Sequence, residues 1–269
     1  NQATPVVAAH DTGLNRGDGR FEGCRVRTDA AGHSAVDKLD AHLARMGRSA
    51  AALEIAFDPP TWREFVLQTL DGWTPPTEAA LGEWAMKLLL TRGAPGSAPT
   101  GLLSLAPLPE HYRAQRRDGI AVITLSRGYA TDAFSGAPWL LGGVKTLSYA
   151  VNMAAQREAA RRSAADVIFA GTDGLVLEAP TSSVVWWSDE TLHTTPLGPS
   201  GILGGTTQQL LFERAAAAGR RTATTPVRVA DLHAADSLWL IGSVRGPVDV
   251  VRLDGTPRGR DETRTAEIR

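Results

Sequence analysis

Alternating polar and apolar positions in the first hundred residues predict a small mixed unit. Residues 20–27 alternate as a half-buried strand does, after a Gly-Asp-Gly turn. Apolar residues then recur on one helical face between 35 and 51, and a second helix is predicted at 61–70, after a Pro-Pro pair. Apolar runs at 86–92 and 100–106 predict two paired strands. The first 110 or so residues are therefore expected to form an α+β unit.

The rest of the chain combines short apolar runs with helical patterns. Strands are predicted at 120–125, 165–170, 175–177, 183–187, 238–241 and 248–253. Helices are predicted at 147–162 and at 206–218, the second closed by Gly219. The polar, basic segment 111–118 is expected either to link two domains or to form a solvated face, and the charged tail from Asp254 to fray. Together these patterns predict a smaller N-terminal domain, 1–114, and a larger C-terminal one, 115–269.

Composition narrows the class of protein. With 43% hydrophobic and 21% charged residues, the 269-residue chain is expected to be globular. A net charge of −1 gives no field that would attract nucleic acid or a membrane surface, and no apolar run is long enough to span a bilayer. Residues 1–4 do not look like a secretory signal, and a single cysteine, Cys24, excludes an internal disulfide, so we expect a cytoplasmic protein. The six histidines are scattered, so no metal site is expected.

The lysines are few, and one of them stands out by its position. Only three of the 28 basic residues are lysines, namely Lys38, Lys87 and Lys145. Lys145 follows an apolar, glycine-rich run at 138–144 and precedes a predicted helix. Burial beside apolar backbone would lower the pKa of its ammonium from about 10.4 and make it a nucleophile toward an aldehyde. The alternative, which spacing alone favours, is a lysine that extends to solvent.

Two further segments suggest a bound phosphate and a buried carboxylate. Residues 201–207 (Gly-Ile-Leu-Gly-Gly-Thr-Thr) open a helix, where free amides, glycines and hydroxyls together suit a phosphate. The segment lacks the Gly-Lys-Ser/Thr of a nucleotide-binding loop, and the alternative is an ordinary loop capped by Thr206. Glu178 follows a predicted strand, where it either pairs with a cationic group such as a pyridinium nitrogen or is solvated.

Six motifs, in this order along nearly the whole chain, resemble the class IV aminotransferases. That family comprises branched-chain aminotransferases, D-amino acid aminotransferases and 4-amino-4-deoxychorismate lyases. The matching segments are 16–22 (Arg-Gly-Asp-Gly-Arg-Phe-Glu), 42–46 (His-Leu-Ala-Arg-Met), 145–149 (Lys-Thr-Leu-Ser-Tyr), 177–183, 201–207 and Gly242-Ser243. Gly204 and Gln208 replace the family's usual proline and arginine in the phosphate loop, and Ser182-Ser183 replaces Ser-Asn.

The resemblance implies a two-domain α/β fold, called fold type IV, with pyridoxal 5′-phosphate in the cleft, and a homodimer. It implies that Lys145 holds the cofactor as a Schiff base and then acts as a general base, while Glu178 keeps the pyridine nitrogen protonated. The residues that it assigns to the cofactor are Arg45, Lys145, Glu178, Ser182, Ser183, Ile202, Leu203, Gly205, Thr206, Thr207, Gly242 and Ser243.

The substrate is expected to carry a carboxylate, for which arginine is the usual ligand. The candidates are Arg25, Arg27, Arg92 and Arg245. The segment 91–98 lacks the Arg-x-His motif of well-known D-amino acid aminotransferases. We nevertheless favour a transaminase that acts on D-amino acids with a 2-oxo acid acceptor. The alternatives are a lyase that releases pyruvate and 4-aminobenzoate, a branched-chain L-transaminase, and a degenerate member without activity, against which Lys145 and Glu178 argue.

Overall fold

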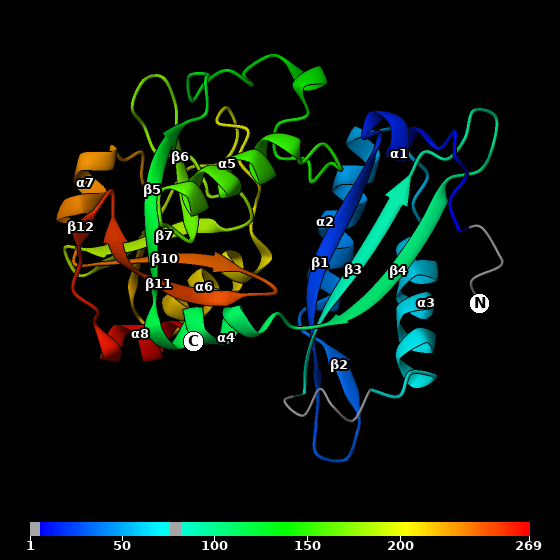
Figure 1. The fold of residues 1–269 in the computed structure, drawn as a ribbon, viewed down its shortest axis with the longest axis horizontal. Helices are drawn as coiled ribbons and strands as arrows, with labels where there is room; N and C mark the ends of the chain where they lie inside the picture. Colours follow the sequence, from blue (N-terminus) through cyan, green and yellow to red (C-terminus); the bar gives the residue numbers. More distant parts are fainter. Residues whose placement is uncertain (1–5, 76–81) are drawn as a thin grey trace. The chain divides into compact units, whose positions relative to one another are not determined.

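The chain divides into two compact units, each with its own sheet (Figure 1). The computed structural model describes residues 6–75 and 82–269, so the four N-terminal residues considered above lie outside it. The first unit comprises Asn1–Leu108 and Val144–Tyr149, and the second comprises Pro109–Gly143 and Ala150–Arg269. The mixed α/β fold expected from the sequence is confirmed. The proposed domain limits, 1–114 and 115–269, stay a prediction.

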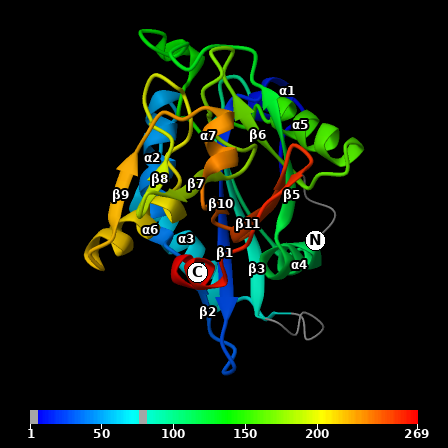
Figure 2. The ribbon, with the colours of Figure 1, turned by 90° about the vertical axis from the view of Figure 1, so that its left-hand side faces the viewer.

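The first unit is a four-stranded antiparallel sheet in the order β2-β1-β3-β4. Its elements are α1 (Thr12–Arg16), β1 (Gly19–Thr28), β2 (Ser34–Val36), α2 (Leu39–Ala52), α3 (Pro59–Asp71), β3 (Glu83–Thr91) and β4 (Thr100–Pro107). The long strands β1 and β3 run side by side in both views (Figures 1 and 2). Cys24 and Val26 of β1 are buried, and Trp62 of α3 packs close to Gly101 of β4.

The helix predicted at 35–51 begins later than its apolar pattern suggests. Residues Ser34–Val36 pair with β1 as β2, and Lys38 has a φ of 57°, which is a left-handed conformation. Helix α2 therefore starts at Leu39. The apolar positions that predicted the helix, Leu43, Met46 and Ala50, are indeed buried. Periodicity located the buried face correctly and misjudged only the first turn.

The second unit is an eight-stranded mixed sheet in the order β6-β5-β11-β10-β7-β8-β9, with β12 paired to β11. Its strands are β5 (Ile120–Ser126), β6 (Asp166–Ala170), β7 (Ser183–Ser188), β8 (Thr191–Thr194), β9 (Arg221–Thr224), β10 (Ser237–Gly242), β11 (Gly246–Leu253) and β12 (Thr256–Pro257). Its helices are α4 (Glu110–Asp118), the 3-10 turn η1 (Pro138–Leu140), α5 (Ala150–Arg161), α6 (Thr206–Ala217), α7 (Val229–Ala234) and α8 (Glu262–Ile268).

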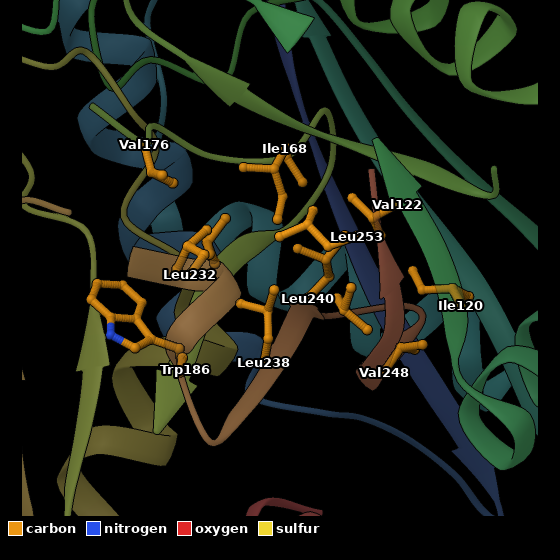
Figure 3. Close-up of a cluster of buried hydrophobic side chains, with 14 of the residues drawn as sticks. Ile120, Val122, Ile168, Val176, Trp186, Leu232, Leu238, Leu240, Val248 and Leu253 are labelled. Carbon is orange, nitrogen blue, oxygen red and sulfur yellow. The ribbon is translucent and has the colours of Figure 1, made fainter. Parts of the chain in front are cut away.

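Both faces of this sheet are covered, which explains the unbroken apolar runs in its central strands. In β10, Leu238 and Leu240 enter one core cluster while Trp239 and Ile241 enter another on the opposite face. Leu232 of α7 caps the first cluster (Figure 3). The two-sided burial makes β10 the rigid centre of the unit.

The segment 111–118, expected to be a link or a solvated face, lies in helix α4, which Pro109 and Gly119 flank and in which no residue is buried, as a solvated face requires. Two other expectations for this unit are wrong. Residues 175–177 form isolated bridges to Ala170 and Arg228 and no extended strand, since the turn at Gly174 and the loop after it leave only one or two pairing positions. The tail is anchored, because Thr265 of α8 is buried and donates a hydrogen bond to Asp249.

Candidate active site

Lys145 is held by both its main chain and its side chain within the first unit. Its carbonyl accepts a hydrogen bond from the Phe21 amide at 3.2 Å, and its own amide donates to Ser49 Oγ at 3.3 Å. The ammonium Nζ lies 4.3 Å from the centroid of the Phe21 ring and donates to Tyr149 Oη at 3.2 Å. An ammonium over an aromatic face is attracted by the ring quadrupole. Lys145 is therefore a half-buried amine with a defined direction and a hydroxyl neighbour.

Two aromatic residues at this lysine were not among the expected site residues. Tyr149 meets Phe21 edge-on with ring centroids 4.9 Å apart, so the two rings support each other as well as Nζ. A second ammonium, that of Lys87, lies 5.5 Å from the centroid of the same Phe21 ring. Tyr149 belongs to the motif at 145–149, and its place in that motif could have indicated from the sequence that it lies near Lys145. Phe21 and Lys87 come close only through the pairing of β1 with β3.

Arg45, expected at the cofactor phosphate, takes part in a buried ion cluster of the first unit. Its guanidinium donates to both oxygens of Glu22, at 2.9 and 2.7 Å, and His42 Nδ1 lies 2.8 Å from the same carboxylate. Glu22 and His42 are fully buried. Burial would raise the pKa of Glu22, but the hydrogen bonds from His42 and Arg45 lower the pKa to about 2. Burial lowers the pKa of His42, despite the opposing effect of Glu22. Glu22 is therefore a permanent anion that orients Arg45.

Glu178 is positioned by the main chain of the second unit. Its carbonyl accepts from the Phe169 amide of β6 at 2.9 Å, and its carboxylate Oε2 accepts from the Leu203 amide at 3.1 Å. Its neighbours Leu177 and Ala179 are buried, whereas Glu178 itself is half-buried. The carboxylate is thus fixed to the loop that precedes α6. This geometry suits a carboxylate that pairs with a ring nitrogen.

Three hydroxyl groups meet at the start of α6. Ser243 Oγ lies 3.0 Å from Thr206 Oγ1 and 3.0 Å from Thr207 Oγ1. Gly205 precedes the helix, and a Cβ at that position would clash with Ser183 Oγ. The amides of a helix N-terminus and converging hydroxyls are donors for an anion, and glycine lets the anion approach the backbone. The residues present therefore fit a phosphate such as that of pyridoxal phosphate. We call Gly205, Thr206, Thr207 and Ser243 the hydroxyl cup.

The four arginines proposed for the substrate carboxylate each contact an acidic residue. Arg25 and Arg27 share one face of β1, as alternation predicted, and both pair with Asp37, at 2.8 and 2.7 Å. Arg92 pairs with Asp18 at 2.6 Å, and its guanidinium also donates to the Leu53 carbonyl. The fourth, Arg245, pairs with Asp166 at 2.7 Å. Their role toward a substrate stays a prediction.

The described residues contain neither a cluster of metal ligands nor a membrane-spanning helix. In residues 6–75 and 82–269, no group of three or more histidine, cysteine, aspartate or glutamate side chains is arranged to hold a metal ion. Within the same residues, no helix is both long and apolar enough to cross a membrane.

Comparison with known proteins identifies close relatives over nearly the whole chain. A family model described as "Amino-transferase class IV" matches residues 19–253. The chain is 41% identical to the bifunctional aminodeoxychorismate lyase / D-amino acid transaminase of Mycobacterium tuberculosis, over 98% of this chain and 91% of that protein. Two structures of a hypothetical aminotransferase from the same organism, one with pyridoxal phosphate (PLP) and one with α-ketoglutarate and PMP bound, each superpose with a TM-score of 0.90. In both, the identity is 40%, and the match covers 100% of this chain and 92% of that one.

Proposed function

Because the chain belongs to the class IV aminotransferase family, we propose that it is a pyridoxal-phosphate-dependent transaminase that moves an amino group from a D-amino acid to a 2-oxo acid. The family and the PLP-bound relative indicate the cofactor. The observation that carries the proposal is Lys145, an oriented, half-buried amine between Phe21 and Tyr149. The D-amino acid transaminase activity in the name of the 41% identical relative supports the donor, and the α-ketoglutarate in the related structure supports the acceptor.

In this proposal Lys145 has two tasks. Its Nζ would hold the cofactor through its aldehyde carbon, and once the substrate amine has displaced it, Nζ would take the proton from the substrate Cα. The Phe21 ring and the Tyr149 hydroxyl keep Nζ in one direction during both tasks. Bound pyridoxal phosphate supplies an electron-withdrawing ring that accepts the electron pair of the broken Cα bond.

The remaining groups bind and orient. The Glu178 carboxylate, fixed by the Leu203 amide, accepts a hydrogen bond from the ring nitrogen and keeps it protonated. The hydroxyl cup and the first amides of α6 would bind the phosphate. The family resemblance also implies Arg45 as a cation for the phosphate. Ser182, Ser183, Ile202, Leu203 and Gly242 complete the proposed lining. By holding the phosphate, these residues would keep the cofactor ring oriented toward Lys145 and the substrate.

The attachment residue is tested without any substrate. Purified protein with added pyridoxal phosphate is reduced with borohydride, digested and analysed by mass spectrometry. We expect the cofactor on Lys145, whereas Lys38 and Lys87, the other two lysines, serve as internal controls. Labelling of Lys38 or Lys87 alone, or no labelling, would remove Lys145 from its proposed role.

The second candidate is the lyase, because the name of the same relative includes aminodeoxychorismate lyase. The same lysine would serve both reactions, so only products separate them. D-Alanine with 2-oxoglutarate should yield D-glutamate, aminodeoxychorismate should yield 4-aminobenzoate, and L-leucine tests the branched-chain alternative. Chromatography of all three mixtures, with Lys145→Ala as the inactive control, decides between them. If 4-aminobenzoate is the only product, the transaminase proposal is wrong. If D-glutamate is the only product, the lyase alternative is wrong.

We further propose a homodimer, which the family resemblance implies, and a cytoplasmic location, which the single cysteine suggests. The single cysteine, Cys24, is buried, so the fold makes no use of an oxidising compartment. Light scattering after size-exclusion chromatography measures the mass, and 28.5 kDa, the mass of one chain, would disprove the dimer. Cell fractionation tests the location.

A further inference from the structure

Arg245 lies in the tight turn that also carries Ser243 of the hydroxyl cup. Gly242 and Gly246 pair across the hairpin of β10 and β11, so residues 243–245 form its turn. The Arg245 side chain does not extend to solvent, as an arginine in a turn usually does. Only 7% of the residue is exposed. A guanidinium buried to this degree needs partners, because an isolated buried charge is strongly unfavourable.

Three partners hold the guanidinium. Nη2 donates to Asp166 Oδ2 at 2.7 Å and to Ser182 Oγ at 3.1 Å, while Nη1 donates to Gln115 Oε1 at 3.3 Å. Asp166 is fully buried at the start of β6, in the two-sided sheet. The turn is thus tied through Arg245 to the buried start of β6 and to the loop that enters β7.

The serine partner links Arg245 to the other wall of the cup. Ser182 is followed by Ser183, whose hydroxyl faces Gly205 so closely that a Cβ there would require the serine side chain to move. Ser183 also pairs with Ile241 at the end of β10. Arg245 itself belongs to the turn that carries Ser243, and its guanidinium contacts the segment 182–183, which lies beside Gly205. The distance between Ser243 and Gly205 in the hydroxyl cup depends on the positions of this turn and this segment.

We propose that Arg245 is a positioning residue for the phosphate group: it binds Asp166 and Ser182, and thereby holds Ser243 and Gly205 at the spacing that receives a phosphate. This inference rests on the proposed function, because it concerns the site at which that function binds its cofactor. It replaces a role for Arg245 in binding the substrate carboxylate. The planar fork of arginine reaches two acceptors at once with fixed geometry, whereas a lysine ammonium is a flexible point charge.

Arg245→Lys tests the proposal, because it keeps a charge for Asp166 and loses the fork. The dissociation constants of the cofactor-free protein for pyridoxal phosphate and for pyridoxal are measured by fluorescence titration. We expect the constant for pyridoxal phosphate to rise about tenfold and that for pyridoxal to stay the same, since only the former has a phosphate. Arg258→Lys is the matched control. Arg258 is a half-buried arginine of the same unit that donates only to carbonyls near α7, and we expect no change in either constant.

A double-mutant cycle with Ser182→Ala tests the route. If Arg245 acts through Ser182, Arg245→Lys weakens pyridoxal phosphate binding less in the Ser182→Ala variant than in the unaltered protein. An unchanged dissociation constant for pyridoxal phosphate in Arg245→Lys overturns the inference and leaves the proposed function standing. If, in addition, the KM for the amino acid rises, Arg245 binds the substrate carboxylate instead. If Arg245→Lys does not fold, strictly unchanged phosphate binding in Ser182→Ala overturns the inference by itself. If the unaltered protein binds no pyridoxal phosphate, the proposed function fails as well.

Discussion

Replacing Glu22 by glutamine would remove a charge from the interior of the first unit while keeping the size of the side chain. Glu22 is fully buried, accepts two hydrogen bonds from Arg45 and one from His42, and has a pKa of about 2. A glutamine retains one acceptor oxygen but removes the negative charge that pairs with the Arg45 guanidinium. Because breaking a buried ion pair on one side is strongly destabilising, the free energy of unfolding at pH 7 should fall by about 3–5 kcal/mol.

The pKa of Glu22 gives an independent magnitude. The ordinary value of 4.5 falls to about 2 in the folded protein. Each pKa unit corresponds to roughly 1.4 kcal/mol, so the ionised carboxylate contributes on the order of 3 kcal/mol. The folded-state pKa is the lower one, so this stability is fully present above the unfolded pKa. It is lost as the pH falls from about 4.5 toward about 2. His42, whose pKa burial also lowers, changes stability in the same direction, beginning near its ordinary value of 6.5.

Urea denaturation followed by circular dichroism measures both effects. The stability difference between the unaltered protein and Glu22→Gln should be largest near neutral pH and should shrink below about pH 4.5. Glu64→Gln is the control, because Glu64 is an exposed glutamate on α3 of the same unit, and its loss should cost less than about 0.5 kcal/mol. A difference for Glu22→Gln below about 1 kcal/mol, or one that does not change with pH, would refute the electrostatic reasoning.

Three further substitutions test the site itself. Tyr149→Phe keeps the ring beside Phe21 but removes the hydroxyl at Nζ of Lys145. In steady-state kinetics, kcat should therefore fall about tenfold with little change in KM, and an unchanged kcat would show that the hydroxyl is unimportant. Glu178→Ala should reduce turnover far more than cofactor occupancy, measured by absorbance after gel filtration; full turnover would contradict its role at the ring nitrogen. Gly205→Ala should clash with a serine hydroxyl and weaken phosphate binding, and an unchanged dissociation constant for pyridoxal phosphate would show that the cup tolerates a methyl group.

Local patterns along the chain predicted most elements and the core of the candidate site. The starts of α3 and α6, the two long strands β1 and β3, and the buried face of α2 follow from helical or alternating periodicity, which neighbouring residues determine. The same holds for Gly205 before α6 and for Thr206 and Thr207 in its first turn, because a helix start is a local structure. Errors arose where local signals compete with pairing. Residues 35 and 36 belong to the predicted helix, yet they pair with β1 as part of strand β2.

The sequence by itself predicted which residues carry the chemistry, namely Lys145, Glu178 and the hydroxyl cup, and this assignment stays a prediction. Only the tertiary structure decided what surrounds them. Phe21 reaches Lys145 through a hydrogen bond between segments more than a hundred residues apart, and this contact assigns Val144–Tyr149 to the first unit. Likewise, nothing near Arg245 in the sequence indicates Asp166 as its partner. The physical reason is that a long side chain finds its partner through strand order and register, which depend on burial of the whole sheet and leave no short-range pattern.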